Sequence, residues 1–132
     1  MKINKKISAT ALTLLAFSIA GCATGSSVSI GKTRPAVQVE SVKVYIEPPK
    51  KFEVIGIVES ASKGGGSNQA KTNRAIERLK QEAAKIGANG VMLGGIGSES
   101  AGYVGGYNNG IIYGGVAKNK TVSGKAIYVI EE

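Results

Sequence analysis

Residues 69–93 read QAKTNRAIERLKQEAAKIGANGVML, and this stretch decides which fold the chain can adopt. Its apolar side chains recur at the spacing of one helix face, at Ile76, Leu79, Ala83 and Ile86. Gly87 follows as a residue that can take the left-handed conformation that closes a helix. The apolar run from Gly90 then predicts a buried strand. We therefore expect a helix over residues 69–86 that returns directly into a sheet.

Two strand patterns precede this helix. Residues 37–46 alternate between apolar and polar types, with a phase slip near Ser41 that indicates a bulge or bend. Pro48-Pro49 ends this strand, because proline cannot donate a ladder hydrogen bond. Residues 52–58 carry apolar side chains on both faces, which favours a central or covered strand. Ser67 or Asn68 is expected to cap the helix.

Residues 94–115 are rich in glycine and separate the strand after the helix from a final strand at residues 122–130. Asn109-Gly110 favours the tight turn of a hairpin, which would place Val91 near Tyr128. A disordered loop is the alternative. The expected fold class is α+β, a single domain with ββαββ order. One mainly antiparallel sheet is packed by one helix, and a long Gly-rich hairpin or loop joins the last two strands.

The beginning of the chain has the layout of a secretory signal. Lys2, Lys5 and Lys6 are followed by the uncharged, mostly apolar residues 7–20, which are too few for a transmembrane helix. Ile19-Ala20-Gly21-Cys22 resembles the lipobox of bacterial lipoproteins. The resemblance implies that the Cys22 thiol is lipidated and that residues 1–21 are removed as a lipoprotein signal peptide. An ordinary signal peptide with Cys22 as a stray thiol is the alternative.

Residues 22–36 are expected to form a flexible tether, since they are rich in glycine and serine. The folded domain would then occupy residues 37–132. Ala23 and Thr24 follow the cysteine, where lipoproteins kept at the inner membrane often carry aspartate. The lipoprotein resemblance therefore implies a palmitate-type lipid anchor in the cell outer membrane, with the domain facing the periplasm.

Composition excludes several classes of function. The chain has one cysteine, no histidine and no aspartate, so a transition-metal site, a common catalytic triad or a disulfide within the chain has too few side chains to form. We expect no enzyme, no metal and no cofactor. The net charge is +8; loss of the three leader lysines lowers the basic count from 17 to 14 against 9 acidic residues, or +5. These charges are scattered, and no known nucleic-acid-binding motif is present.

The glycine-rich segment supplies the candidate partner-binding residues. Tyrosine is favoured at protein interfaces, and the tip of a hairpin would be exposed. The candidates are Tyr103, Tyr107, Asn108, Asn109 and Tyr113. The expected partners are an envelope protein or peptidoglycan, besides the membrane itself. The alternative is a self-assembling or membrane-active protein that uses residues 94–115.

Part of the chain resembles a known group. The residues that carry the likeness are Val42-Lys43-Val44-Tyr45-Ile46-Glu47-Pro48-Pro49, Phe52-Glu53-Val54-Ile55-Gly56 and Ile86-Gly87-Ala88-Asn89-Gly90-Val91. They resemble small envelope lipoproteins related to the Rcs stress-sensor lipoprotein, and the helix with its Gly-Ala-Asn turn is similar to the YbjQ family. The resemblance implies a stress-sensing or envelope-maintenance role. The Rcs sensor is held by disulfides, and this domain has no cysteines to match, so the signalling role is not carried over.

Overall fold

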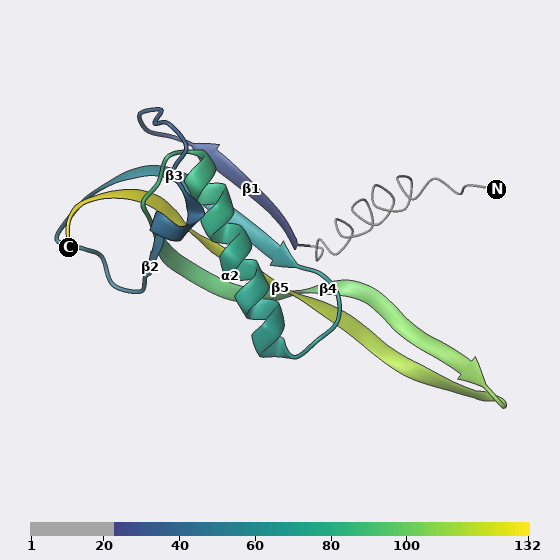
Figure 1. Ribbon diagram of the computed structural model, residues 1–132. Coiled ribbons are helices and arrows are strands. Elements are labelled where there is room, and N and C mark those ends of the chain that lie inside the picture. The colour runs from purple at the N-terminus through teal and green to yellow at the C-terminus, as the bar shows by residue number, and fades with distance from the viewer. Residues whose placement is uncertain (1–22) are drawn as a thin grey trace, which may run out of the picture.

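The computed structural model describes residues 23–132, and for residues 101–104, 107 and 113 it describes the backbone only. The expected signal peptide and the lipidation site Cys22 lie outside the described residues. A twisted sheet carries one helix across one of its faces (Figure 1). The elements are β1 (Ala23–Ser29), the 3-10 helix η2 (Val39–Ser41), β2 (Lys43–Tyr45), β3 (Lys51–Ser62), α2 (Asn68–Lys85), β4 (Gly90–Asn108) and β5 (Ile111–Glu131).

The sheet contains five strands in the order β1-β3-β5-β4-β2. β2 pairs with β4 in parallel, and the other three pairings are antiparallel. The predicted ββαββ fold with one mainly antiparallel sheet is therefore wrong. The described chain is mostly strand, the sheet is mixed, and it includes an N-terminal strand that the sequence analysis did not place in the domain.

That additional strand is β1, which lies where a flexible tether was expected. It pairs with β3 along its whole length, from Ala23 opposite Ser62 to Ser29 opposite Gly56. Its small residues are what permit this position under α2. A Cβ atom on Gly25 would lie 2.6 Å from Cγ of Glu82. The same composition that predicts a tether therefore lets the backbone pack closely beneath the helix.

The first predicted strand covers residues 37–46, but only the three residues of β2 form a strand there. Upstream of it, the backbone amide of Val37 donates to the carbonyl of Ala84 at 3.0 Å, near the C-terminal end of α2. Val37 and Val39 pack against the core, although neither is in a strand. The last carbonyl groups of a helix lack partners within the helix and need hydrogen-bond donors. The amide of Val37 supplies one, so this residue bonds to the end of α2 and not to a neighbouring strand.

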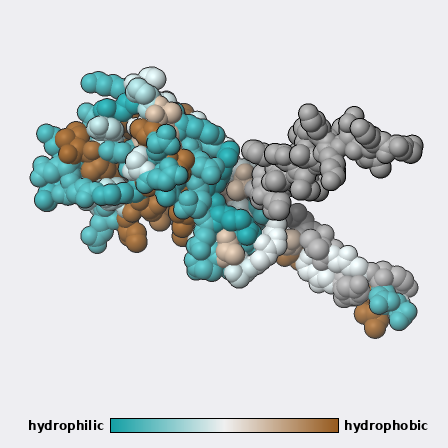
Figure 2. Space-filling view, in the orientation of Figure 1, coloured by the Kyte–Doolittle hydropathy of each residue, from teal (hydrophilic) through white to brown (hydrophobic). Residues whose placement is uncertain are grey.

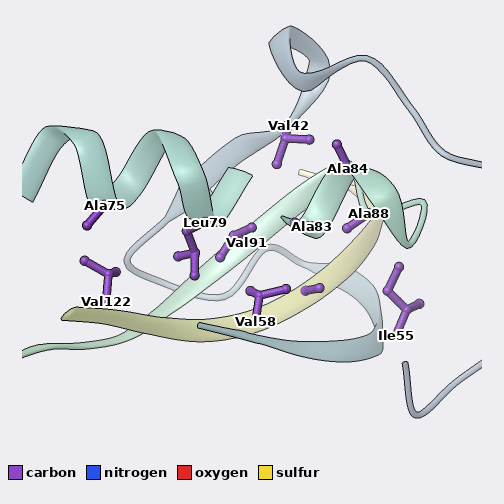
Figure 3. Close-up of a cluster of buried hydrophobic side chains, with 11 residues drawn as sticks. Val42, Ile55, Val58, Ala75, Leu79, Ala83, Ala84, Ala88, Val91 and Val122 are labelled. Carbon is purple, nitrogen blue, oxygen red and sulfur yellow. The ribbon is translucent and has the colours of Figure 1, made fainter. Parts of the chain in front are cut away.

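The core fills the space between α2 and the sheet. It is formed by buried side chains that α2 contributes at Ala75, Leu79, Ala83 and Ala84, and by others from the strands (Figure 3). The oxygen Oγ of Ser67 accepts a hydrogen bond from the amide of Ala70 at 3.1 Å and caps the helix. Gly87 closes the helix with φ +82°, a conformation that favours glycine.

β4 and β5 form one long hairpin, with Asn109 and Gly110 as its two turn residues at φ 48° and 81°. Both values are positive, as the tight hairpin turn requires. The register predicted from this turn is wrong near the core, because Val91 lies opposite Ala126 and not near Tyr128. Two irregularities in β4, at Leu93/Gly95 and Ser100/Gly102, displace the pairing by two residues.

A buried carboxylate connects α2 to β1. The Glu82 side chain is 4% exposed, and its Oε1 lies 2.8 Å from Nη2 of Arg78 and 2.8 Å from Nζ of Lys85. Its other oxygen accepts a long hydrogen bond of 3.5 Å from the hydroxyl of Ser27 on β1. This ion-pair cluster is covered by the first strand.

We expect Glu82→Ala to lower the free energy of unfolding by about 3 kcal/mol, because it leaves the partly buried Arg78 without its carboxylate. The measurement is urea denaturation of the purified protein. Glu77→Ala is the matched control: Glu77 pairs with Lys80 on the exposed side of α2, so its loss should cost about 0.5 kcal/mol or less. Equal effects for the two variants would contradict the placement of β1 over Glu82.

Candidate contact surfaces

The sheet has one face that α2 leaves uncovered. Val58, Ser60 and Ser62 of β3 are buried on the helix side, so the alternate residues of β3 point to the opposite, helix-free face. Strand register then places side chains of four strands in rows across this face. The rows are Val28–Ile57–Lys125–Met92, Ser26–Glu59–Ser123–Gly95 and Thr24–Ala61–Thr121–Gly97.

A hollow of about 600 Å³ lies on the helix-free face. Two of the positions that line it are Gly95 and Gly97, which contribute no side chain next to Ser123 and Thr121. A Cβ atom on Gly97 would lie 2.8 Å from Oγ1 of Thr121, so a larger residue would fill part of this space. We call this site the open-face hollow. Its volume falls in the range of small-ligand sites and of pockets for single side chains.

The lining of the open-face hollow is partly polar and partly apolar, and its charged residues are acidic. Hydroxyl groups come from Thr24, Ser26, Thr121 and Ser123, and carboxylates come from Glu59 and Glu99. None of its lining residues is basic, although the chain as a whole is. Such a surface is complementary to groups that donate hydrogen bonds or carry positive charge. The row beside the hollow carries the exposed apolar side chains of Val28 and Ile57, which are 59% and 47% accessible, and the exposed Lys125.

The second surface is the outer part of the β4–β5 hairpin, residues 101–117, which we call the arm. It projects from the body of the sheet and makes no layer with α2 (Figure 1). All five candidate partner-binding residues lie on it. In the backbone register Tyr103 is opposite Val116, Tyr107 opposite Ile112, Gly106 opposite Tyr113 and Asn108 opposite Ile111, and Asn109 is in the turn.

The arm also carries residues that the sequence analysis did not name. Ile111 and Ile112, directly after the turn, are 67% and 74% exposed. Figure 2 shows hydrophobic and hydrophilic atoms side by side at the far end of the arm. In the sequence, the isoleucine pair directly after Asn109-Gly110 is the feature that could have indicated this exposed apolar tip, because polar residues are expected next to such a turn. The hollow had no comparable signal, because it is assembled from four strands.

A third cluster, at the opposite end of the sheet, ties β2 to the end of the chain. The ammonium group of Lys43 makes a hydrogen-bonded ion pair with Glu132, and the hydroxyl of Tyr45 donates to Oε1 of Glu132 at 3.1 Å. The hydrogen bond from Lys43, followed by that from Tyr45, lowers the pKa of Glu132 below its usual value, and the pKa of Lys43 is raised chiefly by the same bond. This exposed cluster holds the short strand β2 against the end of the chain, and its role is structural.

Two further features concern residues 23–132 as a whole. That part of the chain contains no group of three or more His, Cys, Asp or Glu side chains placed to hold a metal ion. Within the same range, no helix is both long enough and apolar enough to span a bilayer.

Comparison with known proteins adds a fold and no family. No protein family and no curated protein matches the chain. Among solved structures it is similar to the crystal structure of the Francisella virulence factor FvfA, in the orthorhombic form, with a TM-score of 0.51 and 16% identity. The match covers 79% of this chain and 97% of that one. At this identity the likeness concerns the fold alone.

Proposed function

We propose that this chain is a lipid-anchored bacterial envelope protein that acts by binding, without catalysis. The support for the anchor is the sequence: a lysine-bearing start, an uncharged apolar segment, and Ile19-Ala20-Gly21-Cys22 at its end. A thioether-linked diacylglycerol with a further acyl chain would hold the protein on a membrane lastingly, since each buried CH₂ contributes about 0.8 kcal/mol. With Ala23 and Thr24 after the cysteine, we assign it to the outer membrane, facing the periplasm.

The observation that carries the binding role is the open-face hollow. Its carboxylates and hydroxyls favour a partner that presents lysine or arginine side chains, and the exposed Val28 and Ile57 beside it would cover apolar atoms of that partner. At about 3.3 Å per strand residue, Thr24 and Ser26 lie within about 15 Å of Cys22 along the chain. The proposed occupant is therefore a protein seated in the same membrane, in preference to distant peptidoglycan.

The chemistry of the two carboxylates supports a role in recognition. Glu59 and Glu99 are both exposed to solvent. A carboxyl that acts as a general acid in glycoside hydrolysis needs an apolar, desolvated setting to keep its proton near neutral pH. Exposed carboxylates are suited to pairing with a cationic side chain of a partner.

A second candidate is the membrane-active or self-assembling role for residues 94–115. The observation that favours it is the arm, which extends beyond the body of the sheet with exposed Ile111 and Ile112 at its end.

Cys22→Ser tests the anchor in a Gram-negative host that is fed an alkyne analogue of palmitate. We expect the unaltered protein to incorporate the label and to fractionate with membranes after removal of residues 1–21. The serine variant should lose both the label and cleavage at the same bond, because the hydroxyl does not replace the thiol in lipidation. Equal cleavage and membrane attachment in the serine variant would contradict the proposed anchor.

The binding role is tested by photo-crosslinking in intact cells from a benzophenone amino acid at Thr121, in the hollow, and at Gln81, on the exposed side of α2. We expect an adduct with an integral membrane protein from Thr121 only. Glu59→Lys and Glu99→Lys should each lower its yield by about tenfold, because they place like charges against the partner's cations.

Glu77→Lys is the matched charge reversal on α2 and should leave the Thr121 adduct unchanged. An adduct of equal yield from Gln81 would contradict the assignment to the hollow. Binding of the purified protein to isolated peptidoglycan that depends on Glu59 and Glu99 would replace the protein partner with cell wall.

A further inference from the structure

The strand register places the start of β1 and the base of the arm at the same end of the sheet. Ala23 pairs with Ser62, Ser62 with Lys120, and Lys120 with Ser98, so the four residues form one row across β1, β3, β5 and β4. We call this row the anchor end. β4 and β5 continue beyond this row as paired strands, and their hairpin leaves the body of the sheet near the start of β1 (Figure 1).

This placement limits where the arm can lie once Cys22 carries a lipid. Cys22 directly precedes Ala23, so their Cα atoms are about 3.8 Å apart. Because residues 23–29 are paired in the sheet, they provide no slack between the lipid and the domain. The ten residues that follow Ser98, up to Asn108, extend the arm about 30 Å beyond the anchor end. The arm therefore runs towards the membrane or along it.

The chemistry of the arm fits a lipid surface. Residues 101–117 contain no charged side chain, and three of them are the tyrosines at 103, 107 and 113, a residue type enriched at membrane–water interfaces. Its end presents the exposed isoleucines 111 and 112. A water-facing contact loop would not need this combination of an uncharged shaft and an apolar tip.

Basic residues surround the base of the arm. Lys118 and Lys120 lie on β5 at the anchor end, where Nζ of Lys120 donates to Oγ of Ser98 at 3.0 Å. Lys71, in the first turn of α2, donates to the carbonyl of Lys118 at 3.1 Å, and Lys63 directly follows the end of β3. Glu99 is the acidic residue of the hairpin between residues 98 and 120. Lysines at this position would face lipid phosphate groups.

We infer that the arm lies in the headgroup layer of the anionic membrane to which Cys22 is anchored, with Ile111 and Ile112 at the acyl boundary and the lysines of the anchor end against lipid phosphates. This inference rests on the proposed lipidation of Cys22. It gives the second candidate function a defined partner, which is an anionic phospholipid surface.

The arm stays in the interface because its backbone is open on both edges. A two-stranded ribbon pairs only half of its N–H and C=O groups, and each unpaired group is costly in the hydrocarbon core. The headgroup layer supplies water and phosphate oxygens to these edges, while the isoleucines reach apolar surroundings. Entry into the core would require further copies of the arm as strand partners.

The test uses the mature lipid-bearing protein reconstituted in phosphatidylethanolamine–phosphatidylglycerol vesicles. The lipid blocks the chain's only cysteine, so Ile112→Cys provides a single free thiol for an environment-sensitive dye. We expect blue-shifted emission that is quenched more by a nitroxide near the lipid headgroup than by one at the acyl chain end. Lys51→Cys, at the opposite end of β3, is the matched control and should behave as a probe in water.

A second variant tests the charges. Lys118→Gln with Lys120→Gln should raise the water-exposed fraction of the probe at residue 112 several-fold, and so should vesicles of phosphatidylcholine alone. Vesicle flotation in the same samples separates the lipid anchor at Cys22 from the membrane position of the arm. Protein that floats while the probe at residue 112 stays in water would overturn this inference alone. Protein that does not float would overturn the lipid anchor and this inference together. Energy transfer between labelled copies without lipid quenching would overturn the inference in favour of self-assembly.

Discussion

The pairing of β1 with β3 is the constraint on which the rest of the structure depends. A segment of glycine, serine and threonine would be flexible in isolation, but here it completes the edge of the sheet and covers the buried Glu82 on α2. The pairing also supplies one wall of the open-face hollow, through Thr24 and Ser26. Without β1, α2 would expose its ion pairs and the hollow would be open on one side.

With the proposed lipid on Cys22, the same pairing would give the domain a defined orientation relative to the membrane. A lipoprotein with a flexible tether could present any face to its surroundings, whereas a domain whose first strand began one residue after a lipid could turn only within narrow limits. The anchor end, the lysines around it and the arm then share one side of the molecule. The acidic hollow lies next to the anchor end, on the face that α2 leaves free, and its Glu99 is opposite Asn119, between Lys118 and Lys120. In the proposed orientation, the acidic surface that would meet a partner therefore lies beside the basic end that would meet lipid.

Local patterns in the sequence were informative where local physics decides the structure. The helix at Asn68–Lys85 lies one residue from the expected boundaries, and its Ser67 cap and Gly87 terminus follow from chemistry within a few residues. The turn at Asn109-Gly110 is equally local. The five candidate residues on residues 94–115 all lie on the arm.

Non-local competition explains what the sequence did not predict. β1 is a strand because β3 offers it a free edge and α2 needs small residues beneath it, and neither fact is visible in residues 23–29 themselves. The valines at 37 and 39 follow the alternating pattern of a strand, but the amide of Val37 donates a hydrogen bond to Ala84 at the end of α2 and not to a neighbouring strand. The hollow combines Thr24, Glu59, Glu99 and Thr121 from four strands, and the two irregularities in β4 set which residues meet there.

Hydrogen exchange of residues 23–29, measured by mass spectrometry on the protein purified from a Gram-negative host, tests the central claim most directly. If β1 is paired with β3, its hydrogen-bonded amides should exchange slowly, at rates comparable with the strand residues opposite them. Complete exchange of the whole segment at the earliest time point, as in an unstructured tether, would contradict the account.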